Sequence, residues 1–156
     1  MGIEIERKFL IAADGWRAFV TRSETLRQGY LVARHELSVR IRLVDDGVAW
    51  LTIKHGGAAL LRAEYEYPIP VDDAVDLLRH CGHTPIAKRR SHLDLPGGDW
   101  VVDEFEGRHS GLVLAEIEFA RVDAPFDKPD WLGEEVTGDA RYYNSALAAL
   151  PDGGEI

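Results

Sequence analysis

Charged residues alternate with apolar residues along most of the predicted strands of this 156-residue chain. In the first of these segments, Glu4, Glu6 and Lys8 alternate with Ile5 and Phe9. Successive side chains of a strand point to opposite faces, so residues of one parity share a face. Each such strand therefore has one apolar face and one charged face, and the charges are of both signs.

Eight segments have a strand-like composition, and the helical segments show a different spacing of apolar residues. We expect strands at residues 2–11, 26–33, 36–44, 48–55, 61–70, 85–94, 100–106 and 112–121. Apolar residues at helical spacing predict helices at 72–81 and 140–149, and a shorter one near 15–22. The expected N-caps of the two longer helices are Asp72 and Asp139.

Eight strands match a small closed barrel, whose interior can hold one small ligand. The helices need an apolar surface to cover, and the strands supply one on the faces opposite the charges. We therefore expect an α+β fold, a closed eight-stranded antiparallel barrel with a charged lumen and helices packed outside. An open antiparallel sheet with one solvated face shows the same alternation. That alternative predicts Ser, Thr, Asn and Gln among the charges, whereas these positions are almost purely Glu, Asp, Arg and Lys.

The length and composition predict a single cytoplasmic domain. We expect residues 1–150 to form this domain and residues 151–156 to be a flexible C-terminal tail. No apolar run approaches the roughly 18 residues that span a bilayer, and the N-terminus has no apolar signal core. Cys81 is the single cysteine, which excludes an internal disulfide. The net charge of −9 argues against a nucleic-acid duplex as partner, and a homodimer is left open.

The charged motifs follow one another in order along nearly the whole chain. They are Glu4-Ile5-Glu6-Arg7-Lys8, Ser38–Arg42, Leu51–Lys54, Glu64–Glu66, Lys88–Arg90, Val102–Asp103, Ala115–Glu118 and the closing stretch 131–144. The first is the ExExK opening of the CYTH proteins, also called triphosphate tunnel metalloenzymes, and the whole order resembles that family. The resemblance is to the short single-domain bacterial members, and it implies a tunnel-shaped barrel that binds a triphosphate and a divalent metal.

A triphosphate carries several negative charges on closely spaced oxygens, which cations on different walls of a lumen can hold. The expected substrate-binding cations are Lys8, Arg40, Arg42, Lys54, Lys88 and Arg90. Carboxylate oxygens suit Mg²⁺ or Mn²⁺. The expected ligands are Glu4, Glu6, Glu116 and Glu118, as the resemblance also implies, followed by Asp103, Glu64 and Glu66. So many acids in one lumen would repel one another unless cations separate them, which favours bound metal.

Tyr30 has the strand parity that can face the lumen. A strand tyrosine is ordinarily a packing residue. The resemblance to the short bacterial members instead implies that Tyr30 accepts a proton in catalysis, with Lys88 near enough to favour its ionised form. We therefore expect catalytic roles for Tyr30, Lys8 and Lys88. Arg141 either reaches a tunnel carboxylate or lies on a helix surface.

The function that these expectations favour is metal-dependent hydrolysis of inorganic tripolyphosphate to pyrophosphate and phosphate. The choice of substrate comes from the resemblance to the short bacterial members. A class IV-type adenylyl cyclase, or a thiamine or nucleoside triphosphatase, would use the same tunnel for another reaction, but no residue set indicates a purine pocket. A non-catalytic polyphosphate- or nucleotide-binding module is a third alternative. The acidic pairs argue against it, because binding an anion alone would favour fewer acids.

Overall fold

The computed structural model describes residues 2–34, 36–56 and 61–150. Eight strands lie at the expected places: β1 (Gly2–Ile11), β2 (Val20–Ala33), β3 (Leu37–Val44), β4 (Val48–His55), β5 (Leu61–Ile69), β6 (Ile86–Leu93), β7 (Asp99–Phe105) and β8 (Val113–Glu118). The largest difference is at the start of β2, which we expected near residue 26. β2 begins earlier because its first residues already pair with β6, as far as Val20 opposite Leu93.

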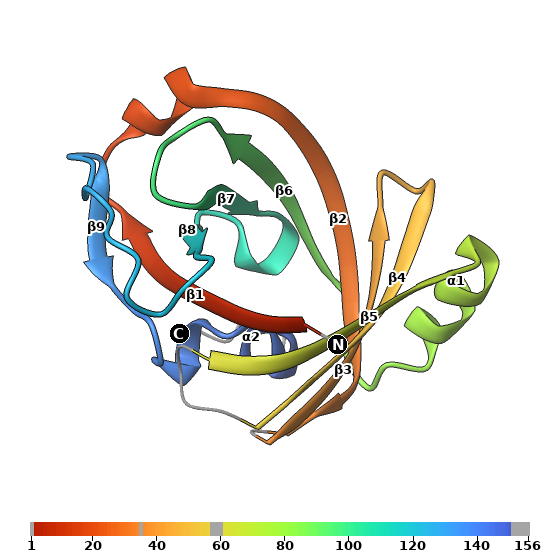
Figure 1. Cartoon of the computed structure of the whole chain (residues 1–156). Helices are drawn as coiled ribbons and strands as arrows, with labels where there is room; N and C mark the ends of the chain where they lie inside the picture. The colour runs from red at the N-terminus through yellow and green to blue at the C-terminus, as the bar shows by residue number, and fades with distance from the viewer. Residues whose placement is uncertain (1, 35, 57–60, 151–156) are drawn as a thin grey trace.

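The strands form one antiparallel ring (Figure 1). Their order round the ring is β5-β4-β3-β2-β6-β7-β8-β1, and β1 pairs with β5 to close it. The expected closed eight-stranded antiparallel barrel is therefore confirmed, and an open sheet with one solvated face is excluded. A short ninth strand that we did not predict, β9 (Leu132–Glu135), pairs with β1 beside Phe9 and Ile11.

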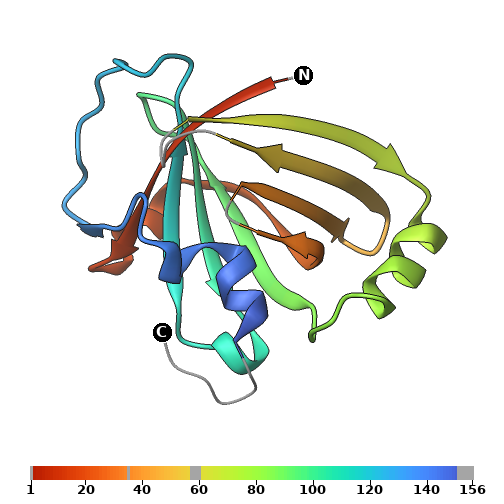
Figure 2. The ribbon, with the colours of Figure 1, turned by 90° about the horizontal axis from the view of Figure 1, so that it is seen from below.

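Helix α1 (Val71–Arg79) packs on the outside of the barrel against β2, β3 and β4 (Figures 1 and 2). It confirms the helix expected at 72–81. The N-cap is Pro70, however, and Asp72 was the wrong choice. Asp72 instead lies in the first turn, where a negative side chain interacts favourably with the helix dipole.

The helix expected at 140–149 is divided into two pieces. A 3₁₀ turn, η3 (Ala140–Tyr142), is capped by Asp139 as expected. Helix α2 (Asn144–Ala149) then packs against β2 and β6. The expected tail at 151–156 lies outside the described residues.

Two further 3₁₀ helices are η1 (Asp14–Phe19) and η2 (Gly107–His109). The first replaces the helix expected near 15–22, and it is shorter because the chain enters β2 at Val20. Among the residues that the structure describes, no helix is long and apolar enough to cross a membrane.

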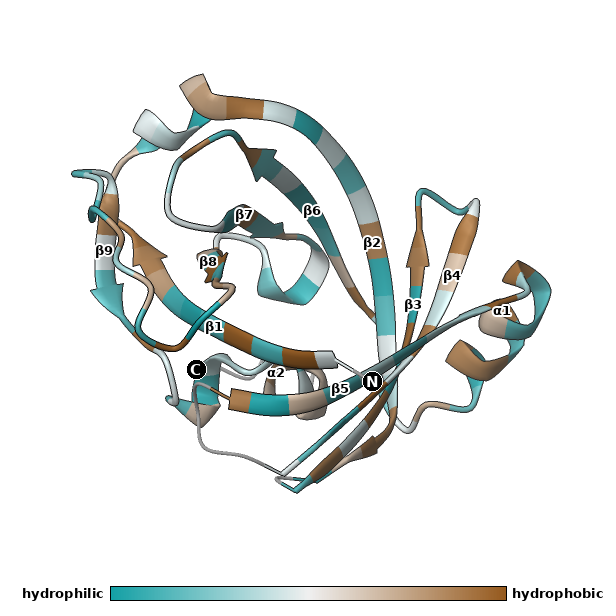
Figure 3. Ribbon diagram, viewed as in Figure 1, coloured by the Kyte–Doolittle hydropathy of each residue, from teal (hydrophilic) through white to brown (hydrophobic). Residues whose placement is uncertain are grey.

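The apolar cores lie between the outer face of the barrel and the segments that cover it. The largest contains Trp100, whose ring makes edge contacts with Phe126 and Trp131, and it also buries Trp16. A smaller core packs under α1 around Leu78. Hydrophilic and hydrophobic residues alternate along the strands (Figure 3). Because the apolar faces are used outside, the charged faces are left to line the lumen.

Candidate active site

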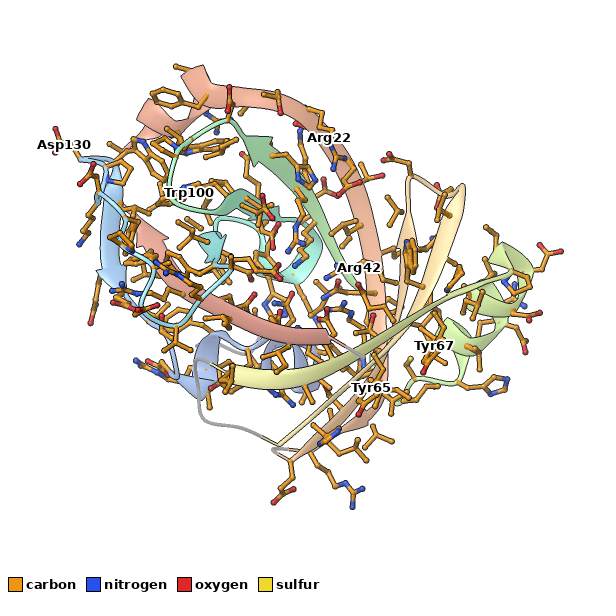
Figure 4. The ribbon with its side chains drawn as sticks, in the orientation of Figure 1. Arg22, Arg42, Tyr65, Tyr67, Trp100 and Asp130 are labelled. Atoms are coloured by element: carbon orange, nitrogen blue, oxygen red, sulfur yellow. The ribbon has the colours of Figure 1, made fainter. Side chains whose placement is uncertain are left out.

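The lumen of the barrel contains a cavity of about 240 Å³. The predicted site residues that line it are Glu4, Glu6, Lys8, Tyr30, Arg40, Arg42, Lys54, Glu64, Glu66, Lys88, Arg90, Glu116 and Glu118. Strand register brings them together, since Lys8 lies opposite Glu116 and Tyr30 lies opposite Arg40. Arg42, labelled in Figure 4, extends toward the inside of the ring of strands. The prediction that one parity faces a shared lumen is confirmed.

Two of the lumen lysines are paired with carboxylates. The ammonium of Lys54 donates to both carboxylate oxygens of Glu4, each at 2.7 Å, and lies 3.4 Å from Glu64 Oε2. The ammonium of Lys8 lies 3.5 Å from Glu116 Oε1 and donates to the Tyr142 carbonyl. The protein itself therefore balances both charges.

Asp103 lies behind the cavity wall and holds Lys88 and Arg90. Arg90 donates to both carboxylate oxygens at 2.8 Å, and Lys88 Nζ donates to Oδ2 at 2.7 Å. Burial alone would raise the pKa of Asp103, but Arg90 and Lys88 hold it well below its usual range. Burial lowers the pKa of Lys88 to about 7, although the charge of Asp103 opposes this change. Both oxygens of Asp103 are thus engaged with cations, which gives its predicted metal role no support from geometry.

Arg40 and Arg42 each donate a hydrogen bond to an uncharged side chain, and Arg40 also has an ion pair with Glu66. Arg40 Nη2 donates to Thr52 Oγ1 at 3.1 Å and lies 3.8 Å from Glu66 Oε2. Arg42 Nε donates to the side-chain oxygen of Gln28 at 2.8 Å. Burial and, after it, the charges of Arg40 and Arg90 together lower the pKa of Arg42 to about 9. These two arginines bring positive charge that their closest hydrogen-bond partners do not neutralise.

The carboxylates of β1 and β8 form a concentration of negative charge. Glu6 lies directly opposite Glu118 in the register of the two strands, an arrangement that destabilises a sheet when both are charged. Burial and, after it, the charges of Glu116 and Glu4 together raise the pKa of Glu6 to about 8. Burial and then Glu4 raise the pKa of Glu118. Burial alone would also raise the pKa of Glu116, but Lys8 and Arg90 lower it to about 2.

These carboxylates fit a divalent cation by their chemistry. Among the described residues, no three acidic, histidine or cysteine side chains lie close enough together to hold a metal ion by themselves. Mg²⁺ commonly uses one or two carboxylates and takes its other ligands from phosphate oxygens and water, so it needs no such cluster. A cation near Glu6 would also remove the repulsion that raises the pKa of this residue.

Tyr30 is buried, with 8 % of its surface exposed, and it lines the cavity. Its backbone N–H donates to His83 Nε2 at 3.1 Å. The Lys88 ammonium, which we expected to lie near Tyr30, donates to Asp103 and Asn144 and lines the same cavity; its effect on Tyr30 stays a prediction. The cations that interact electrostatically with Tyr30 include Lys8 and Arg42.

The C-terminal segment also lines the cavity, although Arg141, the residue of this segment that we considered for the tunnel, is not among the lining residues. The lining residues that it contributes are Thr137, Gly138, Tyr143, Asn144 and Ser145. Asn144 Oδ1 accepts hydrogen bonds from Gln28 Nε2 at 3.0 Å and from Lys88 Nζ at 2.9 Å. A helical pattern predicts α2, but no local pattern states which part of the barrel it covers.

Arg62 is a lumen residue that the sequence reasoning missed. It lines the cavity from β5, opposite Glu4. The signal was available, because Arg62 has the same parity as Glu64. Arg141, in contrast, pairs with Asp139 at 2.6 Å and has a side chain that is 64 % exposed, so it lies on the surface.

Comparisons with known proteins agree with this geometry. The CYTH domain model matches residues 2–143. An inorganic triphosphatase of Acetivibrio thermocellus is 43 % identical over 152 residues, which cover 97 % of this chain and 96 % of that protein. An inorganic triphosphatase of Nitrosomonas europaea is 41 % identical over 151 residues, covering 93 % and 96 % of the two chains.

Solved structures show the same fold. The crystal structure of the inorganic triphosphatase NE1496 matches with a TM-score of 0.66 and 38 % identity over 95 % of each chain. A Hippeastrum protein, described as a putative adenylyl cyclase with a dominant triphosphatase activity, matches with a TM-score of 0.53 over 78 % of this chain and 80 % of its own. At 13 % identity, this second likeness concerns the fold alone.

Proposed function

This chain belongs to the CYTH domain family, and on that premise we propose that it hydrolyses inorganic tripolyphosphate to pyrophosphate and phosphate with the help of Mg²⁺ or Mn²⁺. The observation that carries the proposal is the cavity of about 240 Å³, where arginines without a neutralising partner lie in the same lumen as unbalanced carboxylates. Two relatives at 43 % and 41 % identity are inorganic triphosphatases, which supports tripolyphosphate as the substrate.

The character of the lining favours a bare phosphate chain over a nucleotide. Sites for organic ligands are lined mainly by apolar and aromatic side chains, with a few polar groups that fix orientation. Most of the residues that line this cavity are charged, with Val101, Tyr30 and Tyr143 as less polar exceptions. An adenine base would thus contact charged groups, whereas phosphate oxygens accept hydrogen bonds from them.

In this proposal the lumen cations have different roles. Arg40 and Arg42 donate hydrogen bonds to the phosphate chain, because their hydrogen-bond partners Thr52 and Gln28 are uncharged and the carboxylate of Glu66 is 3.8 Å from Arg40. Lys8 and Lys54 balance the acids that they contact, and so they fix those carboxylates in place. Lys88 is held in position by Asp103 and Asn144.

The residues that would hold the divalent cation are Glu4, Glu6, Glu116 and Glu118. When bound, such a cation supplies positive charge beside the phosphoryl oxygens and the leaving group. The protein keeps the four carboxylates on two adjacent strands, which fixes their spacing.

Tyr30 is our proposed proton acceptor for the attacking water. Its side chain lines the cavity from β2. This strand lies between β3, which carries Arg40 and Arg42, and β6, whose Lys88 and Arg90 contact Asp103. Lys8 and Arg42 line the same cavity as Tyr30. General acid–base residues contribute roughly 10²- to 10⁴-fold to rate.

Turnover assays with purified protein test the proposal. Phosphate release from tripolyphosphate should require added Mg²⁺ or Mn²⁺ and should stop when EDTA is present. With ATP, the same assay should yield slower phosphate release and no cyclic AMP. Cyclic AMP formation would instead support a cyclase, and binding of tripolyphosphate without turnover in either metal would support a binding module.

A further inference from the structure

The backbone of Tyr30 lies beyond the point where the pairing of β2 with β6 ends. The last residues that pair between these strands are Gln28 and Ile86, and β6 begins at Ile86, so no residue of β6 lies opposite Tyr30. On the other edge of β2, the register with β3 shifts between Tyr30 and Val32, which is a β-bulge. Tyr30 is buried, so its backbone N–H needs a hydrogen-bond partner within the protein.

His83 supplies this partner from the connection between α1 and β6. Its Nε2 atom accepts a hydrogen bond from the backbone nitrogen of Tyr30 at 3.1 Å. Its Nδ1 atom lies 2.9 Å from the carbonyl oxygen of Thr84. A carbonyl oxygen can only accept, so Nδ1 carries the ring proton and Nε2 keeps a free lone pair. The two contacts therefore select one neutral tautomer of His83.

His83 itself does not contact the cavity. Among the described residues, Tyr30 lines the cavity and His83 does not. The two rings lie beside each other, with their centroids 6.4 Å apart and their planes at 41°. Any effect of His83 on a reaction in the lumen must therefore pass through another residue, and the hydrogen bond at HN of Tyr30 identifies that residue.

We propose that His83 is a positioning residue, which holds the backbone of Tyr30 at the β2 bulge and thereby fixes the place of the phenolic oxygen in the lumen. This inference rests on the proposed function, in which Tyr30 accepts a proton. Bulges beside active sites re-aim a side chain, and here β6 offers no ladder hydrogen bond that would hold the bulged segment. A misplacement of about 1 Å at a reacting group can lower the rate by about 10²-fold.

Steady-state hydrolysis of tripolyphosphate with Mg²⁺ tests the effect on the reaction. His83→Ala should lower kcat by about 10- to 100-fold and change KM much less, because the groups that contact the phosphate chain are unchanged. His83→Gln should recover part of the loss, since its side-chain oxygen can accept the same hydrogen bond. His80→Ala is the matched control from the end of α1, where the side chain is 70 % exposed, and it should have the wild-type kcat.

The Tyr30→Phe background separates positioning from a general disturbance of the barrel. If His83 acts through the phenolic oxygen, His83→Ala should change kcat by less than about 2-fold once that oxygen is absent, because the two losses are then not additive. A loss of kcat by the same factor in both backgrounds would overturn the inference. Wild-type kcat in His83→Ala would overturn it as well.

NMR spectroscopy tests the hydrogen bond without any turnover. The backbone amide of Tyr30 should exchange its hydrogen about 10-fold faster in His83→Ala than in the wild type. The ¹⁵N shifts of His83 should show a protonated Nδ1 and an unprotonated Nε2. Equal exchange rates, or a proton on Nε2, would refute the contact and the inference with it. Amide protection that depends on His83, in a protein that releases no phosphate from tripolyphosphate with any divalent metal, would support the positioning of Tyr30 and refute the proposed hydrolysis.

Discussion

Replacing Asp103 by asparagine should destabilise the protein strongly, because it removes the buried carboxylate that both Lys88 and Arg90 contact and leaves Arg90 with Glu116 alone. The side chain of Asp103 is 1 % exposed and that of Lys88 is fully buried. Asparagine keeps the shape of the side chain but cannot accept three charged hydrogen bonds. Removing one member of a buried ion pair typically costs about 3–5 kcal/mol.

Because asparagine retains one acceptor oxygen, we expect the lower part of that range, about 3 kcal/mol. For a domain of this length, each kcal/mol lowers Tm by about 2–4 °C, so the expected fall is roughly 6–12 °C. Thermal unfolding followed by circular dichroism at pH 7 measures it. Asp139→Asn is the matched control, because its partner Arg141 is exposed and exposed pairs contribute little to stability.

A second substitution tests the stated cause. If the unpaired ammonium of Lys88 is the main cost, then Lys88→Met should recover part of the lost Tm in the Asp103→Asn background. The reasoning is refuted if Asp103→Asn melts like Asp139→Asn. It is also refuted if Lys88→Met lowers the Tm of the double variant further.

The remaining predictions concern the metal, the proton and the packing of β2. Glu6→Gln should abolish most metal-dependent phosphate release, and near-normal turnover and metal affinity would count against the ligand role. It should also raise the Tm of the metal-free protein at pH 7, because burial and Glu116 disfavour the ionised form of Glu6, which the unfolded chain prefers. Tyr30→Phe should lower kcat by about 10²-fold or more and change KM much less, whereas wild-type kinetics across the pH range would leave Tyr30 a packing residue. Gly29→Ala should destabilise the protein by about 1–3 kcal/mol, because its Cβ would lie 2.7 Å from Cys81 Sγ, while Gly82→Ala, with open space around it, should not. Urea unfolding of both glycine variants checks this difference, and equal midpoints would contradict it.

The barrel and its charged lumen could be predicted because both follow from local periodicity. The parity of Arg40, Lys54 and Glu116 is a property of the extended backbone, and it survives errors of a few residues in the strand ends. The number of strands then indicated closure. The same rule would have included Arg62, because Arg62 has the same parity as Glu64. The sequence therefore contained this signal, and our interpretation of the strand overlooked it.

Other features depend on tertiary contacts that no local pattern encodes. β9 is four residues long and exists because it pairs with β1. The position of Asn144 beside Lys88 depends on where α2 packs. Parity placed Asp103 on the charged face of β7, but it could not show that two cations occupy both of its oxygens.

The distribution of charge explains how a barrel with such a charged lumen stays folded without its ligands. Buried charges are costly unless they are paired, and the internal pairs of Lys54 with Glu4 and of Arg90 with Asp103 meet that requirement. Among the described residues, two sets of lumen groups have no close counter-charge: the guanidinium groups of Arg42 and Arg62, and the carboxyl groups of Glu6 and Glu118, whose pKa values are raised by burial and neighbouring glutamates. A triphosphate would balance the first and a divalent cation the second, while the cation also neutralises the triphosphate. Substrate and metal should therefore each bind more tightly when the other is present, a coupling that must be reciprocal.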